Sequence, residues 1–379
     1  MESRGALPAP AIGADDVPDL AGLFDRPGPF LTVYMNTEPD VEQASQHSVA
    51  RWRNLRRDLE GVGAPADVLD AVEAIVPDAH QNGRTLAVVA NGTGVLLSRG
   101  ELEPITAERG RWAPLPSIGP LLEWRQSSPT HAVVLVDRVG ADIALFTPEG
   151  GEPQALMSVG SQNQNDPHLR KSQPGGWSQR RFQERAENHW EANMKAVAER
   201  LGKLGQLIDL RLVIVAGDVR AVPLLKENLP PQIADRVCEI DGQRAVDGGI
   251  DDVADDAVKM VATAVASDTV AILEKFREEK GQVDRATDGI LSTLAALAEH
   301  RVDTLLVHDD PDDDREAWFS LDPPLAAADP ETIKAQGVDD PQKGRLVDVL
   351  IHTAFRTGAR VRLVPSSAVT EGVGAILRF

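Results

Sequence analysis

The centre of the chain carries a helical pattern of apolar residues. Between Phe182 and Leu204 these residues recur every three or four positions, and the residues between them are mostly polar or charged. An α-helix turns once every 3.6 residues, so this spacing puts the apolar side chains on one face. The pattern predicts a long amphipathic helix, with Trp177 lying before it. The apolar positions are Phe182, Ala186, Trp190, Met194, Val197, Leu201 and Leu204.

The sequence of residues 1–126 predicts an α/β unit that follows a loose N-terminal tail. Residues 1–27 are rich in Pro, Gly and Asp, which favours a tail or a loose cap. Beyond them, β-branched and aromatic runs predict strands, and apolar residues at helical spacing predict helices. Asn91-Gly92 is a hairpin-turn signal. The expected elements are strand Phe30–Met35, helices Ser48–Leu59 and Pro65–Val76, and strands Thr85–Ala90 and Val95–Leu97.

The second unit opens with two strands joined by a tight turn and contains the long helix. A polar stretch, residues 150–174, lies between this pair of strands and the long helix, and it predicts a long loop. Loops of this length inside a domain are commonly functional or disordered. The order of elements predicts a mixed sheet covered by helices. Strands are expected at His131–Asp137, Ala141–Phe146, Arg211–Gly217 and around Cys238, with a further helix at Arg220–Leu229.

The third unit alternates helices and strands behind a connector helix, residues 250–280. This alternation predicts a small α/β/α sandwich with a largely parallel sheet. The fold class is therefore α/β (α+β), in three domains at residues 1–126, 127–249 and 250–379. The elements of the sandwich are helix Gly289–His300, strand Val302–Val307, an acidic insert, helix Arg345–Thr357, and strands Arg360–Val364 and Val373–Phe379.

The composition favours a cytoplasmic protein. Hydrophobic residues make up 42% of the 379, enough for sizeable cores, but their runs are too short to cross a bilayer. The N-terminus lacks the apolar core of a signal peptide. The single cysteine, Cys238, excludes an internal disulfide and cannot form a zinc site by itself. We expect no membrane partner and no cofactor, and we expect Cys238 to be a small buried hydrophobic residue in a strand.

A basic stretch stands out from the overall charge of −20. Such an acidic chain repels nucleic acid at long range, so RNA binding must rest on local patches. Between His168 and Arg185 only Glu184 opposes five basic residues, around Gly175-Gly176 and Trp177. One hypothesis is a finger that binds phosphates and stacks Trp177 on a base; the alternative is a disordered loop with a solvated helix start. The basic residues are Arg170, Lys171, Arg180, Arg181 and Arg185.

A second basic patch falls on the helix predicted at Ser48–Leu59. Its arginines form either a solvated helix face or a contact with rRNA. They are Arg51, Arg53, Arg56 and Arg57.

Two groups of carboxylates in the sequence are candidates for a metal site. Asp137, Asp142 and Asp218 at strand ends permit a metal nuclease, although such residues more often serve turns. The acidic run 309–314 lacks the glycine and the final glutamate of a calcium loop, which favours a solvated insert.

Three segments together resemble one family. Val133–Phe146 looks like the opening hairpin of the middle domain of archaeal and eukaryotic class-one peptide release factors and of Pelota. Gly175-Gly176 with Ser178-Gln179 and Arg185 looks like their Gly-Gly-Gln loop and following helix, and Val302–Val307 with Gly374–Phe379 looks like their C-terminal domain. The likeness covers roughly residues 130 to 379, and the chain resembles the bacterial branch that includes the ribosome hibernation factor Balon.

The resemblance implies a fold and a set of partners. The fold would be a middle mixed-sheet domain of the RNase H-like release-factor type and a C-terminal α/β/α sandwich of the kink-turn-binding ribosomal-protein type. The partners would be the ribosome at its A site, including its rRNA, together with tRNA and elongation factor EF-Tu. The site would consist of Gly175, Gly176, Trp177, Ser178 and Gln179 with the basic residues of the stretch.

The departure from the family motif bears on catalysis. Release factors place a glutamine after the glycine pair to position a water molecule at the ester of peptidyl-tRNA, whereas this chain has Trp177. An indole donates one hydrogen bond and accepts none, so it cannot coordinate water as an amide does. The resemblance thus implies a non-catalytic hibernation factor. The alternative is a peptidyl-tRNA hydrolase or ribosome-rescue release factor that uses Gln179, with Ser178 orienting it.

Overall fold

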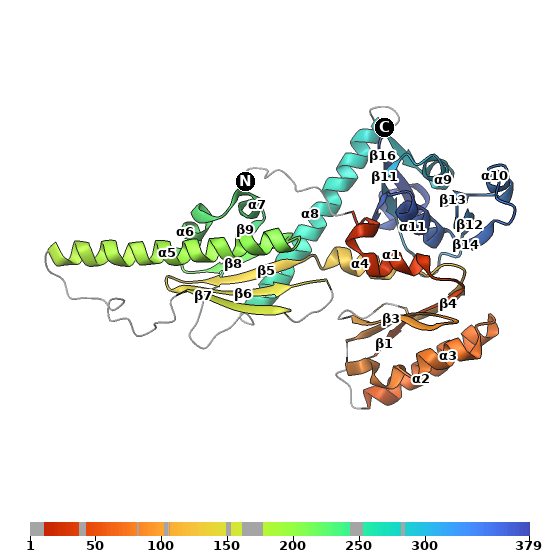
Figure 1. Ribbon diagram of the computed structural model, residues 1–379, viewed down its shortest axis with the longest axis horizontal. Helices are drawn as coiled ribbons and strands as arrows, with labels where there is room; N and C mark the ends of the chain where they lie inside the picture. Colours follow the sequence, from red (N-terminus) through yellow and green to blue (C-terminus); the bar gives the residue numbers. More distant parts are fainter. Residues whose placement is uncertain are drawn as a thin grey trace. The chain divides into compact units, whose positions relative to one another are not determined.

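The computed structural model describes residues 11–37, 43–81, 83–101, 105, 107–148, 153–160, 177–242, 253–281 and 285–379, and only the backbone within 177–189. The chain divides into two compact units (Figure 1). One is Ser127–Ser267, and the other joins Ala6–Gln126 to Asp268–Phe379. The fold is of the predicted mixed α/β class. No helix in the described part of the chain is both long and apolar enough to cross a membrane.

A five-stranded mixed sheet forms the centre of the unit Ser127–Ser267. The strands lie in the order β7-β6-β5-β8-β9; β8 pairs parallel with β5 and β9, and β6 pairs antiparallel with β5 and β7. Alternate residues of β5 face opposite layers: Val134 packs toward α5, and Val133 packs toward α8. The mixed sheet covered by helices is confirmed. The bounds are β5 His131–Val136, β6 Gly140–Phe146, β7 Ala155–Gly160, α5 Trp177–Leu207, β8 Leu212–Gly217, α6 Ala221–Asn228, α7 Pro231–Ala234, β9 Val237–Glu239 and α8 Ala254–Gly281.

Strand β7 corrects the expectation of a single loop over residues 150–174. It pairs antiparallel with β6 along six residues. Ala155, Met157 and Val159 pack against the core, while Leu156 between them is 69% exposed. This alternation is the pattern of a half-buried strand, but its polar flanks obscured it. The rest of that loop lies outside the described residues.

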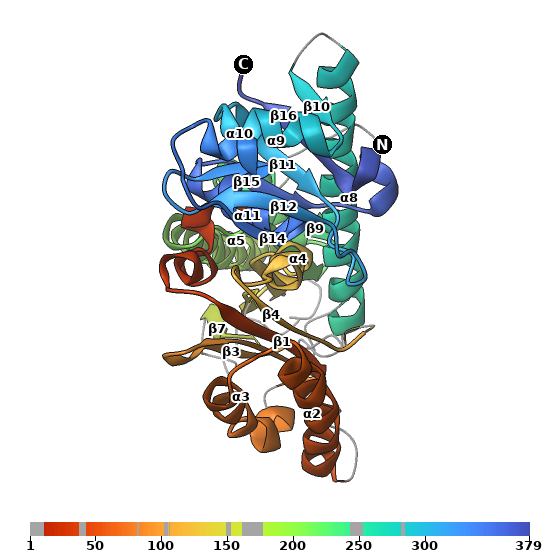
Figure 2. The same cartoon turned by 90° about the vertical axis from the view of Figure 1, so that its right-hand side faces the viewer.

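An antiparallel sheet, in the order β3-β2-β1-β4, forms the N-terminal part of the other unit. One face packs on the helices α2 and α3, which lie together beside the strands in Figure 2, and the opposite face joins the core of the C-terminal part. The predicted Asn91-Gly92 hairpin is present between β2 and β3. The bounds are β1 Phe30–Asn36, α2 Ala44–Gly61, α3 Ala66–Glu73, η3 Val76–Gln81, β2 Thr85–Asn91, β3 Gly94–Glu101, β4 Arg109–Ala113 and α4 Gly119–Ser127.

The N-terminal tail is not loose where the structure describes it. Short helical turns η1 Ala14–Asp16, α1 Pro18–Ala21 and η2 Gly22–Asp25 bury Leu20 and Phe24 in the core shared with the C-terminal part. The backbone of Ile12 also pairs with that of Val361, with N–O distances of 2.8 Å in both directions. The prediction of a loose cap is therefore wrong for residues 11–25, because apolar side chains at helical spacing outweigh a Pro- and Gly-rich composition.

The C-terminal part is an α/β/α sandwich, as predicted, but its sheet is not largely parallel. In the order β10-β16-β11-β15 only β11 and β15 are parallel, because β16 runs antiparallel to both of its neighbours. The acidic insert contains a second sheet, β13-β12-β14, and helix α10. The bounds are β10 Ala286–Asp288, α9 Ile290–Ala298, β11 Val302–Val307, β12 Glu316–Ser320, β13 Leu325–Ala327, α10 Pro330–Lys334, β14 Gln342–Arg345, α11 Leu346–Arg356, β15 Arg360–Leu363, η6 Ser366–Ala368, η7 Thr370–Gly372 and β16 Val373–Leu377.

Candidate nucleic-acid interface

The predicted site falls at the start of helix α5. This helix begins at Trp177, so Trp177 is the first helical residue and does not precede the helix as expected. Ser178, Gln179, Arg180 and Arg181 follow within the same two turns, and Arg185 one turn later. Arg170, Lys171, Gly175 and Gly176 lie outside the described residues.

The backbone alone gives this end of α5 an affinity for anions. The first turn of a helix has N–H groups without helical partners, and the aligned peptide dipoles place partial positive charge there. Positions 181 and 185 are one turn apart, so the backbone places them on one face. A helix start that also carries three arginines is suited to phosphate groups.

The other half of α5 is fixed to the sheet. Met194, Val197, Ala198 and Leu201 are at most 1% exposed and pack against β5, β6 and β8. Figure 1 shows the N-terminal part of α5 continuing past the sheet. The 31 residues of α5 make it about 46 Å long. The apolar stripe thus anchors one end of a helix whose other end carries the predicted site.

The three strand-end aspartates have local structural roles. Asp137 accepts hydrogen bonds from the backbone N–H groups of Val139 and Gly140, at 2.7 and 2.9 Å. Asp142 accepts one from Ser158 Oγ at 2.7 Å. Asp218 accepts one from the N–H of Arg220 at 2.8 Å, at the start of α6. No group of three or more potential metal ligands gathers among the residues that the structure describes.

Ion pairs with nearby carboxylates hold Arg51 and Arg56 of the second basic patch. Arg51 bonds Glu108 at 2.8 Å. Arg56 bonds Glu60, Asp70 and Glu73, and these partners, with Asp70 first, raise its pKa. Arg53 and Arg57 are exposed, and Arg57 contacts Asn54 at 3.2 Å. Two of the four arginines thus remain turned to solvent for the predicted rRNA contact.

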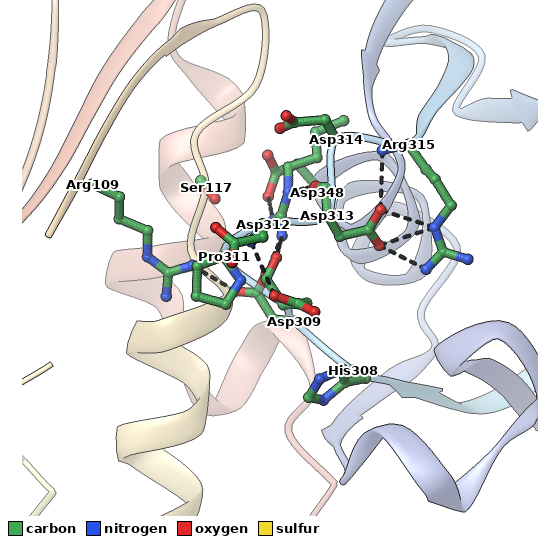
Figure 3. A network of polar contacts seen from close by, with 12 residues as sticks. Arg109, Ser117, His308, Asp309, Pro311, Asp312, Asp313, Asp314, Arg315 and Asp348 are labelled. Carbon is green, nitrogen blue, oxygen red and sulfur yellow. Dashed lines mark hydrogen bonds and ion pairs between the residues drawn. The ribbon is translucent and has the colours of Figure 1, made fainter. Parts of the chain in front are cut away.

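A buried ionic network that the sequence did not predict joins Asp309, Asp313 and Asp348, which Figure 3 labels, through Arg345. Its Nη2 donates to Asp309 Oδ1 at 2.5 Å and its Nε to the carbonyl of Asp313 at 2.9 Å, and its Nη1 lies 3.5 Å from Asp348 Oδ1. The side chains of Asp309, Arg345 and Asp348 are at most 5% exposed. The prediction of a solvated acidic insert is wrong for Asp309 and for Asp313, which Arg315 holds at 2.6 Å.

The N-terminal sheet contributes to the same network. Arg111 of β4 contacts Asp314 Oδ1 at 3.0 Å and donates to the carbonyl of Pro311 at 2.9 Å. Arg109 Nη1 lies 3.9 Å from Asp309 Oδ2. A β-carbon on Gly119 would lie only 2.1 Å from that same oxygen. Only glycine at this position therefore allows α4 to lie so close to Asp309. The network therefore joins segments about 200 residues apart.

One signal in the sequence could have pointed to this network. Asp348 interrupts the apolar run Leu346–Ile351, and a charged residue on the buried side of a helix requires a partner. Burial raises the pKa of Asp348 to about 7, with Arg345 opposing the shift. One turn later, burial lowers the pKa of His352 to about 4. These groups lie where the two terminal parts of this unit meet, since His352 packs edge-on against Phe24 with the ring centroids 5.2 Å apart, and they do not lie in the predicted site.

The unit Ser127–Ser267 combines the antiparallel β5–β6 hairpin, the parallel β5–β8 pair and the long helix α5. Residues 130–282 match the model of the bacterial archaeo-eukaryotic release factor family 2. The predicted resemblance to the release-factor and Pelota-like family is thereby confirmed.

Similarity to other proteins extends along the chain. The uncharacterized protein Rv2629 of Mycobacterium tuberculosis (strain ATCC 25618 / H37Rv) is 28% identical over 368 residues, 95% of this chain and 96% of the relative. The archaeal translation termination factor aRF1 is 18% identical, with 97% of this chain and 99% of that chain covered and a TM-score of 0.25. Archaeal Pelota, in a model of ribosome-bound Pelota and ABCE1, is 15% identical, with 97% and 95% covered and a TM-score of 0.36.

Proposed function

We propose that this chain is a ribosome-binding translation factor of the release-factor and Pelota-like type. It occupies the A site and extends the loop around Gly175-Gly176 to the peptidyl-transferase centre. Its role is to keep idle ribosomes in hibernation during stress, without catalysis. The observation that supports this proposal is that the family match includes the glycine pair and α5, while Trp177 replaces the glutamine of the family motif.

The start of α5 supplies the contacts to RNA in this proposal. Arg180, Arg181 and Arg185, with Arg170 and Lys171 earlier in the sequence, bind phosphates of rRNA or tRNA. Trp177 stacks on an unpaired base, an interaction that tolerates any sequence because every base has a π-face. Gly175 and Gly176 let the backbone approach the RNA closely. Arg53 and Arg57 of the other unit form a second contact with rRNA, and EF-Tu is a further partner.

A binding titration tests the proposal. Arg180, Arg181 and Arg185 are replaced together by Gln, and affinity for 70S ribosomes is measured by co-sedimentation at several salt concentrations. We expect a loss of about tenfold or more, because hydrogen bonds to charged groups are the strong ones, and a shallower salt dependence. Lys195 and Lys203, exposed on the anchored half of α5, provide the control when replaced by Gln. Equal affinity of all three proteins would disprove the assignment.

The alternative function, hydrolysis through Gln179, has its own test. In a peptidyl-tRNA release assay on stalled ribosomes, we expect no release above the spontaneous rate from the wild type. Release that disappears in Gln179→Ala, with ribosome binding retained, would instead establish the hydrolase. Trp177→Gln restores the family motif and serves as the positive comparison.

A further inference from the structure

Two parts of the unit Ser127–Ser267, helix α5 and the junction of β8 and α6, contact Arg138. It occupies the β5–β6 turn, which Asp137 fixes through its hydrogen bonds to Val139 and Gly140. The N–H of Asp137 also bonds the carbonyl of Gly140 at 2.9 Å. The backbone of Arg138 is therefore held in place independently of its side chain.

The first element that Arg138 contacts is α5. Its guanidinium lies over the ring of Trp190, 4.9 Å from the centroid, which is within the range of a cation–π interaction. One turn further along, Asn193 Nδ2 donates to the carbonyl of Arg138 at 3.2 Å. The side chain and the backbone of one residue thus hold two successive turns of α5.

The second element is the junction of β8 and α6. Arg138 Nε lies 3.2 Å from Asp218 Oδ2, and the N–H of Asp218 bonds the carbonyl of Val136 at 2.9 Å. Burial opposes ionisation of Asp218, but the N–H of Arg220 and the charge of Arg138 outweigh it and keep its pKa below the ordinary value. Asp218 therefore offers an ionised partner that sets the direction of the guanidinium.

We propose that Arg138 is a positioning residue that fixes the direction in which α5 leaves the sheet, and thereby the place of the RNA-binding helix start. The inference rests on the proposed function for its consequence, although not for its geometry. Thirteen residues separate Trp177 from Trp190, or about 20 Å of helix. A rotation of about 10° at Trp190 displaces the helix start by about 3.5 Å, more than a hydrogen bond tolerates.

The geometric part is tested without the ribosome. In a Cys238→Ser background, spin labels are attached at Glu187→Cys on α5 and Glu227→Cys on α6, which is exposed. Arg138→Met removes the charge and keeps most of the volume of a side chain that is already 43% exposed. We expect a single narrow distance distribution for the wild type, a clearly broader one for Arg138→Met, and the same Tm for both.

Two further variants separate positioning from a general effect of charge. Arg220→Met also removes a positive charge beside Asp218, but from an exposed side chain, and leaves the distribution unchanged. Arg138→Lys keeps the charge without the planar guanidinium, and gives an intermediate width. An Arg138→Met distribution identical to the wild type would overturn the proposal.

Ribosome affinity then tests the consequence. Arg138→Met lowers affinity about fivefold or more, because the start of α5 is no longer held in one direction when the cation–π contact with Trp190 is lost, whereas Arg220→Met does not. A broader distribution with unchanged affinity would overturn the role of Arg138 in RNA binding. If the wild type itself does not bind ribosomes, the proposed function fails, and the distance distributions still decide the positioning role.

Discussion

Asp348 and His352 lie one turn apart on α11, and burial acts on them in opposite directions. The pKa of Asp348 rises from 3.8 to about 7, so the folded state keeps a proton that the unfolded state loses, and stability falls as the pH rises through this range. The pKa of His352 falls from 6.5 to about 4, so the folded state lacks a proton that the unfolded state binds. Stability therefore also falls as the pH drops through that range. Between about pH 4 and 6.5 the two effects cancel.

Single variants should separate the effects of Asp348 and His352 on the pH dependence of stability. Relative to wild type, Asp348→Asn should become more stable as the pH rises from 4.5 to 6, because only His352 then titrates. His352→Leu should become less stable over the same interval. Each slope is about 1.4 kcal/mol per pH unit at most, measured by urea unfolding. Parallel curves for the wild type and both variants would contradict the assignment, and Asp340→Asn, an exposed position, is the control.

Gly119 allows a second test at the scale of one residue. A β-carbon there would lie 2.1 Å from Asp309 Oδ2, and Arg345 holds that carboxylate in place. Gly119→Ala should therefore destabilise the unit by about 1–3 kcal/mol, the usual effect of overpacking. Gly61→Ala, with no atom within 4 Å of the new β-carbon, should leave stability the same or slightly higher. Equal unfolding midpoints for the two variants would contradict this geometry.

Among the helices and strands, sequence periodicity predicts those elements whose structure depends on contacts between residues close in the sequence. The helix α5 and the β5–β6 hairpin were predicted because their apolar positions follow one period over many residues. Strand β7 was missed because Ala155, Met157 and Val159 are few and their neighbours polar. The direction of β16 could not be predicted, because the local pattern of apolar residues is the same for a parallel and an antiparallel strand. The ionic network around Arg345 could not be predicted, because residues such as Arg111 and Asp314 are far apart in the sequence and come together only in the folded chain.

The anchored half of α5 can be tested through its core. Leu201 is fully buried against the sheet, whereas Leu207 near the end of the helix is 81% exposed. Leu201→Ala should destabilise the unit by about 2–5 kcal/mol, the range for a buried leucine. Leu207→Ala should change stability by less than about 0.5 kcal/mol. Similar losses for the two, by thermal or urea unfolding, would contradict the packing of α5.

At the scale of the whole chain, negative charge is unevenly divided. Residues 6–126 and 268–379 hold 38 Asp and Glu against 23 Lys and Arg, while residues 127–267 hold 20 against 15. The unit that carries α5 is therefore the less repelled by RNA. A protein that binds RNA through this unit would present its acidic parts to solvent or to protein partners, which fits a factor that reaches into the ribosome with one unit.

We propose that the start of α5 enters the peptidyl-transferase centre without hydrolysing the ester. A structure of the wild-type protein bound to ribosomes that carry peptidyl-tRNA tests this most directly. We expect the ester to be intact, Trp177 to stack on rRNA beside it, and Arg180, Arg181 and Arg185 to lie on phosphates. A bound protein with the start of α5 in solvent, or a deacylated tRNA beside Gln179, would contradict the claim.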